Sequence, residues 1–587
     1  MDMSIRGMTR GRHGGKVVTA MLLVGIAAAP GSIPARLPDR NDFAGRCAAM
    51  KGRQSDLLGT IIHAATGPAT FEVRNPFSSQ ALALPPHCEI NATFPARSGM
   101  HSQTYAIKYH MRLPEQWNGR FMFQGGGGTN GEIGDALGST GVGNLPALLQ
   151  GYAVVSQDSG HDNAVNNDPS WGGTAVFGTD PEARRDYGHA SFPKVARAAK
   201  SLIRDFYGVA PKFSYFYGCS KGGQEGMAFA QRYPDLFDGI VAAAPGFSLP
   251  RAAVAQAADT QTFARLWDRE RGKLTPASFA GLFTDTDFAI VHESVAKACD
   301  GLDGLRDGII ADFGRCTSQR VLPSLRLHSC RRVSSVAHCI APAKIDALEG
   351  SLRGPRDRQG NAIYADWPWD LGIGSPDWSF WKLGNAHMPP FNVLIGGMSL
   401  PSVFMVPPRP VTTDPDALLD FLMDLRFPED ARSIYATSKI FPRSSWEDIA
   451  MRSSNLDRFH ALGGKLIVPH GVSDPVFTIN DTIRWRNEVD ARYHHKADGF
   501  VRLFPVPGMA HCGGGPATDR FDAFSALTAW VEKHKAPEFI PATAGPQTPW
   551  PGRTRPLCAY PRVARYDGKG PINSGGSFRC QTPSGRA

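Results

Sequence analysis

Short apolar runs alternate with longer amphipathic stretches over the first and last parts of the chain. The runs are RFMFQ (120–124), YAVVSQ (152–157), FSYFYG (213–218), GIVAAAP (239–245), KLIVPHG (465–471) and VRLFPVPG (501–508). Their length and their β-branched and aromatic residues predict strands, and the stretch HASFPKVARAAKSLIRDFYG before the third run has the apolar spacing of a helix that ends at a glycine. Strands separated by helices predict an α/β fold, with a mostly parallel sheet and helices on both faces.

This alternation stops between residues 248 and 440. Acidic-glycine turns, tryptophans and proline-rich pieces such as MPPF and MVPPRP replace it. A chain of 587 residues is also too long for one ordinary compact domain. We therefore predict a main domain formed by residues 30–247 and 441–587, into which residues 248–440 are inserted.

The first 29 residues have the pattern of a secretory signal. Basic residues at positions 6, 10, 12 and 16 precede an apolar run of 13 residues, VVTAMLLVGIAAA, which is followed by Pro30 and small residues. Thirteen residues are too few to span a bilayer, and no later stretch reaches 18 apolar residues. A buried helix is the alternative. We predict a signal peptide over residues 1–29 and a soluble protein that is secreted or periplasmic.

The charge of the chain points to no charged partner. The formal net charge of +9 becomes +6 without the signal segment, which holds four basic residues and Asp2. The remaining basic residues are dispersed without a Lys/Arg-rich run. This argues against nucleic acid and against a membrane surface as binding partners.

The third apolar run leads into a G-x-S-x-G motif, Gly218-Cys219-Ser220-Lys221-Gly222. The motif lies between a predicted strand and the predicted helix GGQEGMAFAQRY, which stops before Pro234. That arrangement is typical of a nucleophile elbow, in which glycines allow a crowded turn that exposes the serine hydroxyl. A structural serine in a glycine-rich turn is the simpler alternative.

A nucleophilic serine needs a base and a carboxylate that orients the base. KLIVPHGVSDPVF provides Asp474 and VRLFPVPGMAHCGGG provides His511, each after a predicted strand, in the order Ser, Asp, His of α/β-hydrolases. His161, His470 and Asp158 also follow predicted strands. Their order or their neighbours fit the triad less well, so we expect them in supporting positions around it.

An export signal makes the ten cysteines candidates for disulfides. Closeness along the chain favours Cys299 with Cys316, Cys330 with Cys339, and Cys558 with Cys580. Cys219 precedes Ser220 and Cys512 follows His511, so a Cys219–Cys512 disulfide would hold the loops of nucleophile and base together. A free thiol at Cys219 with a redox role is the alternative.

Acyl transfer also requires donors for an oxyanion. The run Gly125-Gly126-Gly127-Gly128 follows the predicted strand RFMFQ, and glycines let main-chain N–H groups approach a ligand. We predict the N–H groups of Gly126 and Gly127 as donors, together with that of Lys221, the residue after the nucleophile. A plain flexible loop is the alternative.

Two features of residues 248–440 are candidates for binding. CDGLDGLRDGIIADFGRC (299–316) alternates Asp residues with glycine turns, which suits an oxygen-seeking Ca²⁺, although a set of Asp-Gly turns would look the same. WPWDLG and DWSFWKLG contain four tryptophans that either stack on an aromatic substrate or belong to the core. These are Trp367, Trp369, Trp378 and Trp381; we expect Trp378 and Trp381 at the substrate pocket.

Five motifs together resemble one family. GGGGTNG, GCSKGG, CDGLDGLRDGII, SDPVF and MAHCGGG are similar to motifs of the tannase and feruloyl esterase family, which includes MHETase-like hydrolases of terephthalate monoesters. The resemblance extends from about residue 40 to the C-terminus. It implies an α/β-hydrolase fold with a large inserted lid domain, residues 248–440, between the nucleophile strand and the acid strand.

The resemblance also implies roles for single residues. Ser220 would be the nucleophile, His511 the general base and Asp474 its partner, with the Cys219–Cys512 disulfide beside them. A structural Ca²⁺ in the lid would be held by the side chains of Asp300, Asp303 and Asp307 and by the carbonyls of Leu305 and Ile309. Phe477 would border the acyl pocket, and Cys47 would pair with Cys88. A lid arginine that grips a free carboxylate sets selectivity for terephthalate monoesters; Arg409 and Lys382 are candidates for that role.

The sequence thus predicts a secreted serine esterase that hydrolyses small-molecule esters of aromatic carboxylic acids, of the feruloyl, galloyl or terephthaloyl type, through an acyl-enzyme. A general carboxylesterase or an acyltransferase with the same triad is one alternative. A catalytically dead, calcium-dependent binding protein is another.

Overall fold

The structure is a computed structural model that describes residues 42–75, 78–330 and 338–583. The predicted signal peptide and the first residues after it lie outside the described residues. From Phe43 onward the chain forms one compact unit. No helix in the described ranges is both long enough and apolar enough to span a membrane.

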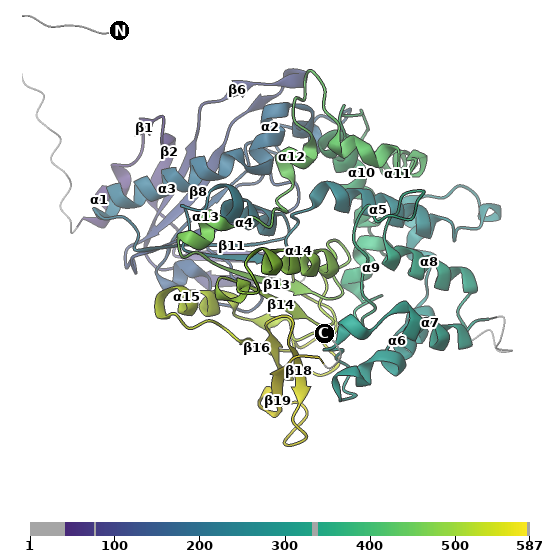
Figure 1. The fold of residues 1–587 in the computed structure, drawn as a ribbon. Helices are drawn as coiled ribbons and strands as arrows, with labels where there is room; N and C mark the ends of the chain where they lie inside the picture. Colours follow the sequence, from purple (N-terminus) through teal and green to yellow (C-terminus); the bar gives the residue numbers. More distant parts are fainter. Residues whose placement is uncertain (1–41, 76–77, 331–337, 584–587) are drawn as a thin grey trace, which may run out of the picture. The chain divides into compact units, whose positions relative to one another are not determined.

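A ten-stranded mixed sheet is the largest sheet among the described residues (Figure 1). Its order is β1-β2-β5-β8-β10-β9-β11-β12-β13-β14. The bounds are β1 Gln54–Ser55, β2 Gly59–Thr66, β5 His87–Thr93, β8 Lys108–Pro114, β9 Arg120–Gln124, β10 Ala153–Gln157, β11 Phe213–Cys219, β12 Gly239–Ala243, β13 Lys465–Gly471 and β14 Val501–Val506. Pairing is parallel from β10 to β14 along this order, and antiparallel from β1 to the β8–β10 pair.

The parallel part of the sheet confirms the six strands predicted from the apolar runs. RFMFQ and KLIVPHG coincide with β9 and β13 at both ends, and the other four runs extend at most two residues beyond their strands. All five residues of β12 are buried, as expected of a central strand with both faces covered.

Helices cover both faces of this part of the sheet (Figure 1). On one face Phe216 and Ile240 pack in the same core as residues of α3 (Ser191–Tyr207) and α4 (Lys221–Arg232). On the other face Tyr215 and Val241 pack in the same core as residues of α15 (Ala523–Lys533). Helix α3 ends as predicted, because Gly208 adopts φ 79° and its N–H caps the carbonyl of Arg204.

Further helices are found among the described residues, and one of them, α14, packs in the same core as Leu466 and Leu503 of the sheet. They are α1 Phe43–Ala48, α2 Pro181–Arg185, α5 Leu249–Ala264, α6 Asp285–Cys299, α7 Ser318–Leu327, α8 Pro342–Arg353, α9 Pro376–Lys382, α10 Gly397–Ser399, α11 Pro415–Asp424, α12 Ser445–Ile449, α13 Asp457–Ala461 and α14 Ile479–Arg492.

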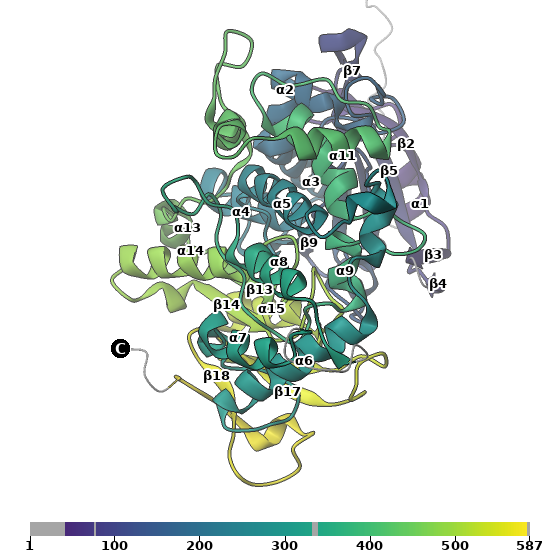
Figure 2. The ribbon, with the colours of Figure 1, turned by 90° about the vertical axis from the view of Figure 1, so that its right-hand side faces the viewer.

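The connection between neighbouring strands β12 and β13 contains the whole of residues 248–440, which we call the lid segment. Its helices α5 to α9 and α11 gather on the right of Figure 1 and face the viewer in Figure 2. The division of the chain into a main and an inserted domain stays a prediction, since the described residues from Phe43 onward form one compact unit.

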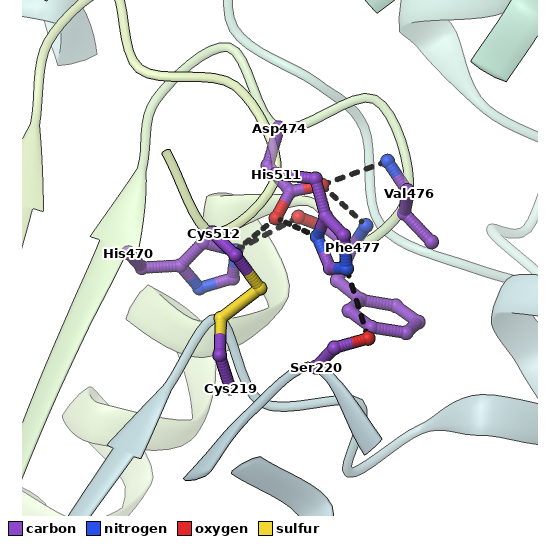
Figure 3. Close-up of a disulfide and its surroundings, with 8 residues drawn as sticks. All are labelled: Cys219, Ser220, His470, Asp474, Val476, Phe477, His511 and Cys512. Carbon is purple, nitrogen blue, oxygen red and sulfur yellow. Dashed lines mark hydrogen bonds and ion pairs between the residues drawn. A yellow bond between two sulfur atoms is a disulfide. The ribbon is translucent and has the colours of Figure 1, made fainter. Parts of the chain in front are cut away.

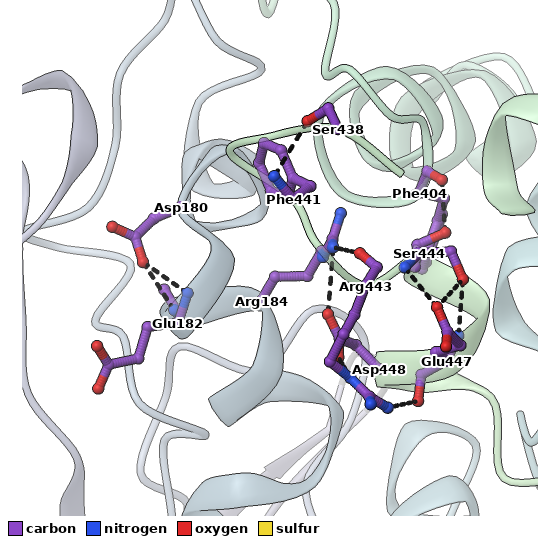
Figure 4. Close-up of polar contacts among 12 residues, drawn as sticks. Asp180, Glu182, Arg184, Phe404, Ser438, Phe441, Arg443, Ser444, Glu447 and Asp448 are labelled. Atoms are coloured by element: carbon purple, nitrogen blue, oxygen red, sulfur yellow. Dashed lines mark hydrogen bonds and ion pairs between the residues drawn. The ribbon is translucent and has the colours of Figure 1, made fainter. Parts of the chain in front are cut away.

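A buried arginine anchors the end of this long connection. Arg184 of α2 is fully buried and donates through Nη2 to the carbonyl of Arg443 (2.6 Å) and to Oδ2 of Asp448 (3.1 Å) (Figure 4). Asp448 belongs to α12, which begins with a capping box between Ser444 and Glu447. The contact fixes the chain where it leaves the lid segment on its way back to the sheet.

The C-terminal part adds smaller sheets below the main sheet in Figure 1. Strands β15 (Arg520–Phe521), β16 (Phe539–Thr543) and β17 (Thr554–Cys558) form one, and β18 (Val563–Tyr566) pairs with β19 (Phe578–Gln581). Further two-stranded sheets are β3 (Thr70–Asn75) with β4 (Ser78–Ala83) and β6 (Arg97–Ser98) with β7 (Thr104–Tyr105). The structure contains five disulfides, Cys47–Cys88, Cys219–Cys512, Cys299–Cys316, Cys330–Cys339 and Cys558–Cys580.

Candidate active site

Ser220 lies at a sharp turn between β11 and α4. It adopts φ 64° and ψ −120°, a conformation that L-residues rarely adopt. A Cβ added to Gly218 would lie 2.6 Å from the carbonyl of Gly222, so the turn requires glycine there. The predicted elbow is therefore present as strand, strained turn and helix.

Three side chains form a hydrogen-bonded chain at this turn (Figure 3). Nε2 of His511 lies 2.8 Å from Oγ of Ser220, and Nδ1 of His511 lies 2.8 Å from Oδ2 of Asp474. The residues come from the ends of β11, β14 and β13, which meet at one edge of the parallel sheet. In this arrangement His511 can take the serine proton while Asp474 holds the ring in the required orientation.

Asp474 is fully buried and ionised by its surroundings. Its Oδ1 accepts the N–H groups of Val476 (2.8 Å) and Phe477 (3.0 Å), and its Oδ2 faces His511. Burial would raise the pKa of Asp474, but His511 and His470 outweigh it, so that the pKa lies below its ordinary value. The carboxylate is thus held in its charged form, in which it can accept a hydrogen bond from His511.

The competing residues lie around the triad and not in it. Nε2 of His470 lies 2.9 Å from the carbonyl of Phe477 and 3.4 Å from Oδ2 of Asp474, so His470 supports the acid. His161 stacks on Phe177 with ring centroids 3.9 Å apart, and burial lowers its pKa to about 3. Asp158 accepts the N–H groups of Lys108 and Gly160.

The Cys219–Cys512 disulfide joins the loops of Ser220 and His511 (Figure 3). The two Cα atoms are 6.1 Å apart, within the usual range for a disulfide. Cys512 adopts φ 64°, so the residue after His511 also has strained backbone. The bond lies beside the Ser220–His511 hydrogen bond that it would keep short.

The glycine run packs backbone to backbone against the start of α4, but one prediction about it was wrong. A Cβ on Gly222 would lie 2.7 Å from the carbonyl oxygen of Gly126. The N–H of Gly126 donates to Oε2 of Glu225 (3.2 Å), so it does not face the serine as an oxyanion donor. Gly127 has no such bond, and the N–H of Lys221, in the first turn of α4, has no acceptor within its helix.

Glu225 is the residue that holds this glycine loop, and the sequence reasoning missed it. It is fully buried and accepts from Gly126 N–H, from Nδ2 of Asn130 (2.9 Å) and from Nζ of Lys221 (3.1 Å). A glutamate four residues after a lysine on a helix is a detectable ion-pair signal, but burial of the pair is not visible in the sequence.

A lid-covered pocket opens above Ser220. Trp381 of α9 and Phe477 both line it, and their rings stand edge-on to His511 with centroids 5.4 and 5.3 Å away. The other lining residues are Gly128, Thr129, Tyr187, Lys221, Leu249, Ala252, Ala253, Gln256, Ile395, Ser399, Phe404 and Val476. Tyr187 was missed because it lies in an irregular helical stretch whose register the sequence does not reveal. The lining is predominantly apolar, as expected of a small-molecule site.

The prediction that Trp378 lines the pocket was wrong. It lies on α9, three residues before Trp381, but only 1% of it is exposed. Its ring packs edge-on against Phe263 and Phe288 in the core of the lid segment. Trp367 and Trp369 are buried as well.

Neither proposed carboxylate grip lines the pocket. Arg409 pairs with Asp430 (2.6 Å), and Lys382 is buried in an ion pair with Asp259 and lies over the ring of Trp367. Among the described residues that line the pocket, Lys221 is the one cation, and its ammonium group pairs with Glu225. The pocket therefore offers an anionic substrate group no unpaired positive charge.

The predicted calcium loop is a compact turn region between α6 and α7. Asp303 accepts the N–H groups of Leu305 (3.1 Å) and Ala311 (2.8 Å), and Asp300 accepts that of Gly308. Burial and, to a smaller extent, the charges of Asp307 and Asp300 raise the pKa of Asp303 to about 7. Carboxylate and main-chain oxygens are the ligand type that a hard divalent cation prefers.

The carboxylates of the loop of residues 300–309 do not form a ready-made metal site. No group of three or more His, Cys, Asp or Glu side chains in the part of the chain that the structure describes is arranged to hold a metal. Asp307 instead forms an ion pair with Arg555 of β17. The calcium site, including the carbonyls of Leu305 and Ile309, stays a prediction.

Comparison with known proteins places the chain in a family. The family profile described as "Tannase and feruloyl esterase" matches residues 94–581. The mono(2-hydroxyethyl) terephthalate hydrolase of Piscinibacter sakaiensis is 38% identical over 562 residues, 92% of each chain. A probable feruloyl esterase of Arthroderma benhamiae is 29% identical over 506 residues, 84% of this chain and 85% of that one.

Solved structures agree with the fold. Feruloyl esterase B from Aspergillus oryzae has a TM-score of 0.71 at 22% identity and covers 92% of this chain and 100% of its own. Tannin acyl hydrolase from Aspergillus niger has a TM-score of 0.62 at 19% identity and covers 94% of this chain and 96% of its own. The chain has the α/β-hydrolase fold and belongs to the tannase and feruloyl esterase family of carboxylic ester hydrolases.

Proposed function

We propose that this protein hydrolyses uncharged esters of aromatic carboxylic acids through an acyl-enzyme on Ser220. The observation that carries the proposal is the Ser220–His511–Asp474 hydrogen-bonded chain at the floor of an apolar pocket bordered by Trp381 and Phe477. Two aromatic rings beside the base favour a flat acyl group, because aromatic pairs in edge-to-face or offset arrangements are attractive.

The geometry of the three side chains supports the following reaction. His511 accepts the Ser220 proton through Nε2 as Oγ bonds to the ester carbonyl carbon, and the carbonyl oxygen becomes an oxyanion. His511 then donates that proton to the leaving alkoxide, which departs as the alcohol and leaves an acyl-serine. Water, deprotonated by His511, attacks the acyl carbon; the acid is released and Ser220 regains its proton.

The oxyanion is stabilised by main-chain N–H groups. We assign this role to Lys221 at the start of α4 and to Gly127 in the glycine loop. The N-terminus of a helix carries positive partial charge, so a developing anion at Lys221 N–H is favoured. Gly126 is excluded because its N–H donates to Glu225.

The pocket favours an acyl group without a free carboxylate. The cations considered for a carboxylate grip, Arg409 and Lys382, are engaged with acidic partners. Burying an unpaired carboxylate costs several kcal/mol, so a terephthalate monoester should bind less well than a feruloyl or galloyl ester.

Initial rates on four esters test both parts of the proposal. Methyl ferulate, methyl gallate, mono(2-hydroxyethyl) terephthalate and a short aliphatic ester are supplied to the wild type and to Ser220→Ala. We expect Ser220-dependent turnover with the two uncharged aromatic esters preferred, and labelling of Ser220 by a fluorophosphonate. Turnover of the aliphatic ester alone would indicate a general carboxylesterase, no turnover and no labelling would favour a binding protein, and ester products formed with added alcohols would indicate an acyltransferase.

We also propose that the protein is exported after removal of residues 1–29. Five disulfides in the described part of the chain are what an oxidising compartment permits. The mass and N-terminal sequence of protein recovered from periplasmic and culture fractions test this. A full-length protein found with the cytosolic fraction would contradict it.

Finally, we propose a structural Ca²⁺ at the loop of residues 300–309. The carboxylates of Asp300, Asp303 and Asp307 with the carbonyls of Leu305 and Ile309 would hold it. Bound there, the ion supplies charge neutralisation for a cluster of buried carboxylates and takes no part in ester chemistry.

A further inference from the structure

The loops that carry Asp474 and His511 are joined by a carboxylate of the lid segment. Oδ2 of Asp370 accepts the hydroxyl of Ser473 (2.7 Å) and the N–H of Gly508 (2.7 Å). Ser473 immediately precedes Asp474, and Gly508 lies three residues before His511. A single oxygen atom therefore connects the loop that carries Asp474 to the loop that carries His511.

The backbone around Asp370 is packed tightly between these loops. Gly372 N–H donates to Oγ of Ser473 (3.1 Å). A Cβ on Gly372 would lie 2.4 Å from that Oγ and 2.5 Å from the carbonyl oxygen of Gly508, so no larger residue fits without movement of a loop. In the same stretch Nε1 of Trp367 donates to the carbonyl of Asp474 itself (2.9 Å).

Asp370 is a buried carboxylate that forms hydrogen bonds but no ion pair with any described residue. It is 1% exposed, and its bonds go to a hydroxyl and a backbone N–H; no basic side chain among the described residues pairs with it. Burial raises the pKa of Asp370 to about 6. A buried carboxylate without a cation is costly, but it accepts two donors on one oxygen more strongly than a neutral group does.

We propose that Asp370 is a positioning residue for the Asp474–His511 contact: by holding Ser473 and Gly508 on one oxygen, it sets the separation of the two loops. This inference rests on the catalytic roles proposed above for Asp474 and His511. The disulfide Cys219–Cys512 braces the Ser220–His511 contact, and Asp370 braces the other contact of the triad. The lid segment would then hold the catalytic residues in position in addition to covering the pocket.

Two substitutions separate positioning from general stability. Asp370→Ala removes the acceptor and leaves two buried donors unpaired. Asp370→Asn keeps an oxygen that accepts the same two donors, so it is the conservative variant. Asp287→Ala is the matched control, because Asp287 is also a buried lid carboxylate, but its bonds go to Thr284 and Lys344, away from the triad loops.

The experiment measures kcat, KM and Tm for the wild type and the three variants on the best ester of the panel. For Asp370→Ala we expect kcat to fall by about tenfold or more with KM within about twofold, because a small misplacement of the base slows chemistry without removing binding contacts. Asp370→Asn should keep kcat within about threefold of the wild type. Asp287→Ala should lower Tm and leave kcat unchanged.

Wild-type kcat in Asp370→Ala, with Tm lowered as in Asp287→Ala, would show a stability role and overturn the proposal. An equal loss of kcat in Asp370→Asn and Asp370→Ala would also overturn it, because the two hydrogen bonds that Asn can keep would then not explain the rate. If Asp370→Ala does not fold, Ser473→Ala removes one side of the bridge, and unchanged kcat there decides against the proposal. Activity that survives Ser220→Ala would instead contradict the proposed function itself.

Discussion

Cys219 and Cys512 are bonded to each other although 293 residues separate them, and each is the direct neighbour of a residue in the Ser220–His511 hydrogen bond. The disulfide therefore fixes the two loops at the point where the proton is proposed to move. A cross-link of this kind restricts the unfolded chain and the native loops at once.

Removal of this disulfide should reduce both stability and turnover. For Cys219→Ala/Cys512→Ala we expect unfolding free energy lower by about 2–5 kcal/mol and kcat lower by about tenfold or more. Denaturant unfolding and steady-state kinetics measure the two effects. Cys558→Ala/Cys580→Ala is the control, which should cost stability while kcat stays unchanged; equal kcat in both double variants would contradict a positioning role.

The buried pair Lys221–Glu225 should behave as one unit. Glu225→Gln and Lys221→Met each leave a buried charge without its partner, so each should cost about 3–5 kcal/mol of stability. The double variant should cost less than the sum of the two, which a double-mutant cycle from denaturant unfolding measures. Additive losses would show that the two charges are independent.

The two tryptophans of α9 should respond in opposite ways. Trp381→Ala removes a pocket wall, so KM for methyl ferulate should rise by about tenfold while a short aliphatic ester is little affected. Trp378→Ala opens a cavity in the core and should cost about 3–5 kcal/mol of stability with smaller changes in KM. If Trp378→Ala changed KM more than Trp381→Ala, the assignment of the two rings would be wrong.

Asp158 should make the stability of the protein depend on pH. Burial raises its pKa to about 8 from the ordinary 3.8, so between these values the native state holds a proton that the unfolded state has lost. Stability must therefore fall as pH rises through this window, by up to about 1.4 kcal/mol per pH unit from this group. Asp158→Asn cannot ionise and should become more stable relative to the wild type from pH 5 to pH 9 in urea unfolding. A constant difference between the two would exclude this role of Asp158.

Chelation should lower Tm if the loop of residues 300–309 binds calcium. A ligand bound to the native state alone stabilises it, and its removal reverses that effect. We expect EDTA to lower Tm of the wild type, excess Ca²⁺ to restore it, and Asp303→Asn to be insensitive to both. An identical melting curve with and without EDTA would exclude the site.

Much of the fold was predictable because its signals are local. The strands β9 to β14 are apolar runs of ordinary strand length, and the elbow, Asp474 and His511 follow three of them in an order that the parallel sheet brings to one edge. Cys219 and Cys512, which are next to Ser220 and His511 in the sequence, independently predicted that these two residues lie close together. The antiparallel strands β1, β2, β5 and β8 were not predicted, because β1 consists of two polar residues and polar residues interrupt the apolar ones in the other three, so that none is a continuous apolar run.

The errors arose where tertiary packing decides. Trp378 and Trp381 lie three residues apart on one short helix, and only the direction in which α9 meets its neighbours determines which ring reaches the pocket. Gly126 was assigned to the oxyanion because a glycine run exposes N–H groups, but the buried carboxylate of Glu225, 99 residues later, takes that donor. Asp370 has no sequence signal, since the role proposed for it depends on two loops more than a hundred residues away.

Strands β12 and β13 are neighbours in the sheet, yet roughly 220 residues of chain are synthesised between them. A nascent chain therefore presents the nucleophile elbow long before the acid and base exist, with the edge of β12 still unpaired. Pairing across so long a connection is slow unless the intervening helices have already folded and shortened the gap. We expect truncated translation products that end before Lys465 to be prone to aggregation, because the edge of β12 then has no partner strand.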